Sequence, residues 1–143
     1  MDFLTALRIS GAGLGVERTR VNLATSNLAN AETTRTAEGG AYKRLDPVIQ
    51  AVPFPAELGE AQSLGSPPMK AEIAAIVADQ TPGRKVYSPG HPDADPEGFV
   101  VFPNVNPVHE VVNLMSASRS YEANATAIDT LKTMAQRGLD IAR

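Results

Sequence analysis

The sequence predicts a mainly α-helical fold in which long helices at the two ends flank a small β-containing middle. All eleven prolines lie between Pro47 and Pro107, and none lies in residues 1–46 or 108–143. Proline lacks the backbone donor that a helix interior needs, so both ends can be helical and the middle cannot form one long helix. Both ends also repeat apolar residues with a heptad period, which is typical of helices that pack along their length on other helices.

These observations divide the chain into three regions. We expect residues 1–31 and 107–143 to form the N- and C-terminal helices, which pair as a coiled-coil-like domain. We expect residues 32–106 to form short strands and turns packed outside that pair. Within this middle region, residues 53–68 are rich in proline and glycine and are predicted to be a flexible, exposed loop.

The C-terminal helix has the clearest start in the sequence. Asn106 supplies an N-cap, and Pro107 stands at the first helical position, where its missing donor costs nothing. Apolar and small residues then recur along two lines that together form one packing seam. The first line contains Leu114, Tyr121, Ile128, Ala135 and Ala142, and the second contains Ala117, Asn124, Leu131 and Gly138.

The N-terminal helix carries two apolar lines on nearly opposite faces. They contain Leu7, Leu14, Val21 and Leu28, and Ile9, Val16 and Leu23. A lone surface helix needs one apolar face, so two faces predict packing on both sides. Gly11, Gly13 and Gly15 each weaken a helix by about 1 kcal/mol relative to alanine. We therefore expect this helix to be partly or wholly disordered in the free monomer and to order on assembly; the alternative is an ordinary two-helix core with a glycine hinge.

Strands are predicted only in the middle region. The best candidates are residues 70–77 and 98–102, and a weaker one spans residues 42–52, where Pro47 interrupts the apolar pattern.

The composition offers little for catalysis or cofactor binding. The chain has no cysteine and only two histidines, and its formal net charge of −3 does not favour nucleic-acid binding. His91, Asp93 and Asp95 form the most site-like stretch, because alternating acids followed by glycine occur in calcium loops. The flanking prolines and the absence of a downstream glutamate favour turn-capping aspartates instead. We predict no enzyme activity, no cofactor and no metal.

The start of the chain lacks the basic segment and the apolar run of a secretory signal, and no stretch is long and apolar enough to span a bilayer. A route out of the cytoplasm would therefore use no cleaved signal peptide.

A cluster of polar residues surrounds the predicted end of the N-terminal helix. It contains Asn27, Leu28, Ala29, Asn30 and Thr33. Asn30 is a natural helix stop, because asparagine tolerates left-handed dihedral angles and caps carbonyls. The local pattern gives no reason for Asn27.

This cluster resembles the Asn-Leu/Ile-Ala-Asn signature of the flagellar rod, hook and filament axial family. Further stretches are similar to the proximal rod members of that family, and they cover residues 39–44, 86–95, 98–100, 103–107 and 117–124. The resemblance spans nearly the whole chain. The loop at residues 53–68 and the N-terminal glycines depart from the family pattern.

The resemblance implies a structural subunit of the bacterial flagellar basal body that polymerises helically into the proximal rod. It implies export through the flagellar type III apparatus, terminal helices that line the channel, and a rod that crosses the periplasm and transmits torque. The implied partners are other copies of the chain, other rod proteins, the membrane-ring adaptor and the export apparatus. The alternative is a soluble helical adaptor or export-associated protein that does not polymerise, and a metal-dependent enzyme is a more distant one.

Overall fold

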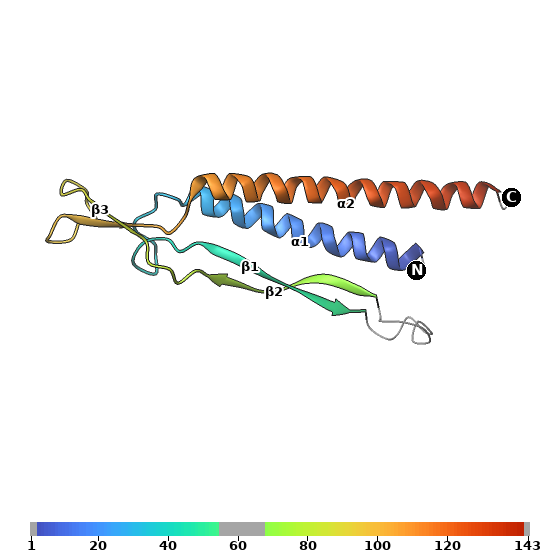
Figure 1. The fold of residues 1–143 in the computed structure, drawn as a ribbon, viewed down its shortest axis with the longest axis horizontal. Helices are drawn as coiled ribbons and strands as arrows, with labels where there is room; N and C mark the ends of the chain where they lie inside the picture. The colour runs from blue at the N-terminus through green and yellow to red at the C-terminus, as the bar shows by residue number, and fades with distance from the viewer. Residues whose placement is uncertain (1–2, 55–67, 142–143) are drawn as a thin grey trace.

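The computed structural model describes residues 3–54 and 68–141. Two helices lie side by side and run in opposite directions, so the first residues of one and the last residues of the other lie at the same end (Figure 1). A long β-hairpin lies along the other side of the first helix, and a shorter hairpin lies at the far end. The elements in order are α1 (Phe3–Ala29), β1 (Leu45–Pro53), β2 (Met69–Ala78), β3 (Arg84–Tyr87), β4 (Phe99–Phe102) and α2 (Pro107–Ile141).

Helix α2 begins where the sequence predicts. Pro107 is its first residue, and the Asn106 side-chain oxygen accepts hydrogen bonds from the backbone N–H groups of Val108 (3.0 Å) and His109 (3.4 Å). This cap satisfies donors that have no partner inside the helix. The helix continues for 35 residues, a length of about 52 Å at 1.5 Å per residue.

Helix α1 is continuous over 27 residues, and its three glycines do not interrupt it. It ends where Asn30 donates a side-chain hydrogen bond to the backbone oxygen of Ser26 (2.9 Å), so the predicted helix stop is confirmed. Whether α1 orders only on assembly stays a prediction, because a single chain does not test it.

The two helices share one antiparallel register. Gly13 lies against the side chain of Asn124, and the Asn27 side chain bonds to Glu110. This register places Phe3 level with Met134, so the last two turns of α2 extend beyond α1, as Figure 1 also shows.

Helix α1 has a partner inside the chain on each of two sides. Val21 lines a groove with Leu114 of α2, whereas Leu23 lines a cavity with Pro47 and Ile49 of β1. Helix α1 therefore contacts both α2 and the β1–β2 hairpin, and one residue of each apolar line lies at these contacts. The apolar line of Ile9, Val16 and Leu23 therefore does not by itself require a neighbouring copy of the chain. The two apolar faces of α1 are then no longer an argument for polymerisation.

The three predicted strand regions are strands in the structure. Strands β1 and β2 pair antiparallel, with Pro47 opposite Ile76 and a register shift between Val48 and Ile49. Proline is tolerated there because a two-stranded ribbon has free edges. The backbone N–H of Phe54 bonds to the oxygen of Pro68 (3.2 Å); most of the loop predicted at 53–68 lies outside the described residues.

Strand β3 is an element that the sequence reasoning did not predict. It has four residues, mostly exposed, and it pairs antiparallel with β4. A segment so short carries too little periodicity to be distinguished from a turn.

The core of the described chain is small. Its buried apolar residues are Val16, Ala24, Val100 and Ala117, and the buried polar residues are Asn27 and Glu110. Polar contacts therefore hold positions that apolar side chains fill in a larger domain.

Neither described helix has the length and apolar content of a membrane span.

The α1 glycines allow a stability test. A Cβ at Gly11 or Gly15 would meet no atom within 4 Å, whereas one at Gly13 would lie 3.0 Å from the amide of Asn124. We predict that Gly15→Ala raises the free energy of unfolding by about 1 kcal/mol. Gly13→Ala should gain clearly less or lose stability, because Asn124 must move. Urea unfolding measures both, and an equal gain at the two positions would contradict the close helix contact.

Candidate assembly site

A buried hydrogen-bond network joins α1, α2 and the start of β1, and its centre is Asn27. The Asn27 residue is 1% exposed. Its amide nitrogen donates to the backbone oxygen of Leu45 (2.9 Å) and to Glu110 Oε2 (3.1 Å). Its amide oxygen accepts from the Leu45 backbone N–H (2.9 Å) and from the Tyr42 hydroxyl (2.9 Å). The amide thus uses its full hydrogen-bonding capacity. We call these residues, with Arg44 and Asp46, the polar joint.

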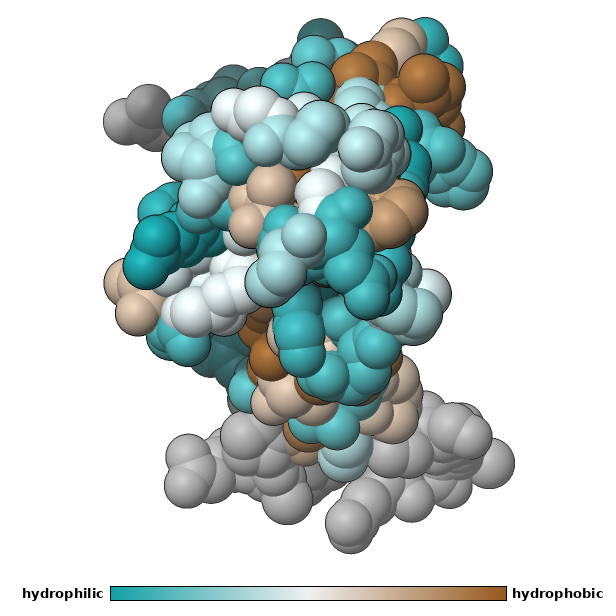
Figure 2. Space-filling model, turned by 90° about the vertical axis from the view of Figure 1, so that its left-hand side faces the viewer, coloured by the Kyte–Doolittle hydropathy of each residue, from teal (hydrophilic) through white to brown (hydrophobic). Residues whose placement is uncertain are grey.

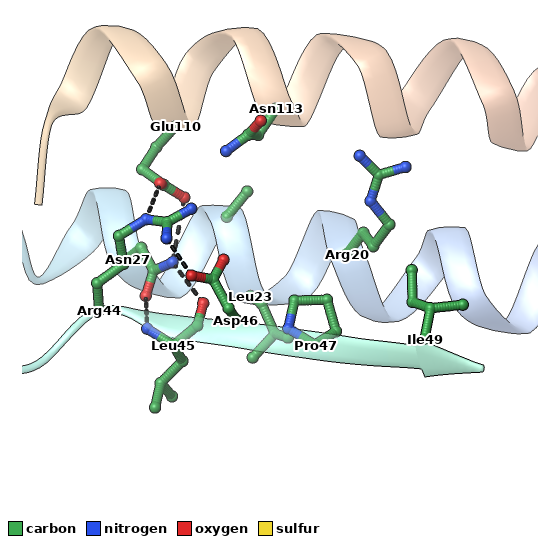
Figure 3. Close-up of a pocket in the computed structure, with 11 residues that line it drawn as sticks. Arg20, Leu23, Asn27, Arg44, Leu45, Asp46, Pro47, Ile49, Glu110 and Asn113 are labelled. Carbon is green, nitrogen blue, oxygen red and sulfur yellow. Dashed lines mark hydrogen bonds and ion pairs between the residues drawn. The ribbon is translucent and has the colours of Figure 1, made fainter. Parts of the chain in front are cut away.

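The second half of the polar joint is ionic. Figure 3 shows Glu110 from α2 and Arg44 and Asp46 from the β1 segment converging beside Asn27. The Glu110 carboxylate is 1% exposed, and its Oε1 accepts a hydrogen bond from Arg44 Nε at 2.6 Å. Arg44 also pairs with Asp46. A buried carboxylate is tolerated when it is both paired and hydrogen-bonded, and Glu110 is both.

The charge of Arg44 is held firmly in this setting. Burial lowers its pKa, but the hydrogen bond and charge of Glu110 and the charge of Asp46 outweigh that effect. The pKa of Arg44 therefore lies above its ordinary value, and the guanidinium stays charged throughout the accessible pH range.

The polar joint extends into the loop before α2. The Asn104 side-chain oxygen accepts the backbone N–H of Arg44 at 3.0 Å. The Asn104 amide nitrogen is buried and has no hydrogen-bond partner among the described residues.

An open cavity of about 290 Å³ lies beside the polar joint, between α1, α2 and β1. Arg20 on its wall pairs with Glu17 at 2.9 Å. The other charged groups on its wall, Arg44, Asp46 and Glu110, are paired with one another.

In the candidate metal-binding stretch, Asp95 and His91 cap local turns and Asp93 makes a long-range contact. Asp93 accepts a hydrogen bond from the Thr34 hydroxyl (2.8 Å), and Asp95 accepts the backbone N–H of Phe99 (2.8 Å). His91 Nδ1 accepts the backbone N–H of Asp93 (3.1 Å). The described residues include no group of three or more His, Cys, Asp or Glu side chains placed to hold a metal ion. The interpretation as turn-capping aspartates therefore holds for Asp95, whereas the Asp93 side chain bonds to Thr34, 59 positions away, and joins two distant loops.

The residues predicted for an assembly interface lie along both helices. Val16 is buried and Tyr121 is exposed. The remainder are half-buried: Leu7, Leu14, Val21, Leu23, Leu28, Leu114, Ile128 and Leu131. Half-buried apolar residues keep surface for further contacts, and their role between copies stays a prediction.

The signature cluster is tied to the polar joint. The Thr33 hydroxyl donates to the Asn30 side-chain oxygen (3.2 Å), and the Tyr42 backbone N–H donates to the Thr33 oxygen (3.0 Å). Leu28 is half-buried and Ala29 is exposed. Residues 27–33 and 39–44, which each resemble the axial family, therefore contact each other in the structure.

The roles of Arg44, Asn104 and Glu110 were missed at the level of sequence. One signal was present for Glu110. It lies one heptad before Ala117, on the line that continues to Asn124 and Leu131, so it is a charge on an otherwise uncharged packing line. Such a residue calls for a buried partner, which is Arg44.

Comparison with known proteins places the chain in a class of flagellar proteins. Residues 97–141, which cover β4 and the whole of α2, match the family described as flagellar basal body rod FlgEFG protein C-terminal. The chain is 37% identical to the flagellar basal-body rod protein FlgC of Salmonella typhimurium, over 99% of this chain and 98% of the relative. The FlgC proteins of Bacillus subtilis and Borreliella burgdorferi are 36% and 34% identical, with at least 98% of each chain covered. The chain belongs to the FlgC family of flagellar basal-body rod proteins.

The polar joint can be tested with the two asparagines of the signature cluster. We predict that Asn27→Ala lowers the free energy of unfolding by roughly 2–4 kcal/mol, because it leaves Leu45 and Glu110 groups buried without a partner. Asn30→Ala is the matched control; it removes local bonds near a helix end and should cost about 1 kcal/mol. Urea unfolding of both variants measures the difference, and equal losses would exclude a special role for Asn27.

Proposed function

We propose that the chain is a structural subunit of the proximal rod of the bacterial flagellar basal body and that it polymerises helically. In this proposal the helices of residues 1–31 and 107–143 pair as a coiled-coil-like inner domain that lines the export channel. Residues 32–106 pack outside that domain. The assembled rod transmits torque, and no catalytic step is part of the proposal.

The proposed partners are other copies of the chain, other rod proteins, the membrane-ring adaptor and the flagellar export apparatus. The proposed location is the basal body where it crosses the periplasm, reached without a cleaved signal peptide. Support comes from relatives named as flagellar basal-body rod proteins that match along almost their whole length.

The observation that carries the proposal is the exposed apolar surface of α2. Val108, Val112 and Met115 lie on its first turns with half or more of their surface exposed, although α1 packs alongside. The end of the molecule near these turns is largely hydrophilic, with its most hydrophobic patch at the upper right and smaller ones lower down (Figure 2). A contiguous exposed apolar surface is typical of a face that binds another protein.

A charge on this face should block assembly without unfolding the monomer. Val112 is 60% exposed, so Val112→Asp should change the free energy of unfolding little. In a strain lacking its own copy, the recovery of the variant in purified basal bodies should fall at least about tenfold, because an unpaired charge would be buried. Val112→Thr, of the same shape and uncharged, is the control and should assemble. Val16 is unsuitable, because it is buried within the chain.

Swimming in soft agar provides a second readout of the same variants. Normal motility and normal recovery of Val112→Asp would contradict the proposal that this face of α2 packs against another subunit in the rod. Wild-type chain absent from purified basal bodies would contradict the rod role itself and favour a soluble adaptor.

A further inference from the structure

The last two turns of α2 have no partner in the described chain. They extend beyond the first residue of α1, and Leu139 and Ile141 are 73% and 88% exposed. Met134, level with the start of α1, is also largely exposed. We call residues 134–141 the α2 tail. Large apolar side chains this exposed at a helix end leave water only through a contact that the described residues do not provide.

A groove of about 440 Å³ lies farther back along the same helix pair. Its apolar wall is formed by Val21 of α1 and by Leu114 and Met115 of α2. Arg119 and Glu122 of α2 lie at its polar side, together with Ser118. The groove thus offers an apolar strip with charges at one end.

The groove carries Arg119 and Glu122, and the tail carries Arg137 and Asp140, so one opposite-charge pair can form between them. Arg119 at the groove and Asp140 in the tail are both without an ion-pair partner among the described residues. They stand 21 positions apart on one helix, which is about 32 Å. They therefore cannot pair within a chain, but they can pair between two copies.

We propose that the α2 tail of one copy docks in the groove of a second copy, with Asp140 against Arg119. This inference rests on the proposed function and names the surfaces that a polymerising subunit uses. With parallel α2 helices offset by about 32 Å, Met134 and Leu139 lie on either side of Leu114 and Met115 of the second copy. Such a contact joins two different surfaces, so it leaves a free tail and a free groove for further copies and builds an open assembly.

Disulfide trapping tests the contact directly, because the chain has no cysteine of its own. The double variant Ser118→Cys with Leu139→Cys should form a disulfide-linked dimer in purified basal bodies. A disulfide within one chain is excluded, since the two positions are about 32 Å apart and a disulfide joins Cα atoms within roughly 7 Å. The matched control is Ser116→Cys with Leu139→Cys, because Ser116 is exposed on α2 but does not line the groove. It should not form the dimer.

Charge reversal provides an independent arm. Arg119→Glu or Asp140→Arg alone should lower recovery in basal bodies about fivefold, and the two together should restore it. Asp140→Arg with Lys132→Asp restores net charge without restoring the pair, and it should stay low.

Absence of the Ser118–Leu139 dimer, equal trapping in the control, or failure of the double reversal to rescue would overturn the docking. The amount of wild-type chain in the same basal-body preparations tests the rod role separately. The docking can therefore fail while the rod role stands.

Discussion

The buried amide of Asn27 is the contact on which the arrangement of elements depends. It bonds both backbone groups of Leu45 and also Glu110, so one side chain fixes β1 and α2 against α1. The ion pair of Glu110 with Arg44 then closes the other side. Because a polar group buried without a partner costs more than an apolar contact gains, this network permits one arrangement of the three elements and penalises others.

The remainder of the molecule has little apolar material to add. Its helices meet through small or polar residues such as Gly13, Ala24, Ala117 and Asn124, which allow close approach but bury little area. Several larger apolar side chains of α2, among them Val112, Met115 and Met134, face outward. A chain built in this way is specified by its polar joint and keeps its hydrophobic surface for contacts with other molecules.

Much of this architecture could be predicted because its causes are local. The cap at Asn106, the stop at Asn30 and the apolar runs of β2 and β4 each depend on a few neighbouring residues. The role of Asn27 could not be derived in the same way, because Glu110 lies 83 positions away. The second apolar line of α1 indicated a partner correctly but could not say that the β1–β2 hairpin provides it.

The antiparallel helix pair joins the two ends of the sequence, so the pair can form only after the whole chain has been synthesised. During synthesis α1 and the β1–β2 hairpin emerge before α2 exists. Throughout that interval Asn27 lacks Glu110, and the α2 side of α1 is bare. Closing a contact of such long sequence separation is also intrinsically slow. The nascent chain therefore spends an extended period incompletely folded. Any protein that binds it during that time can contact the surface of α1 that α2 later covers.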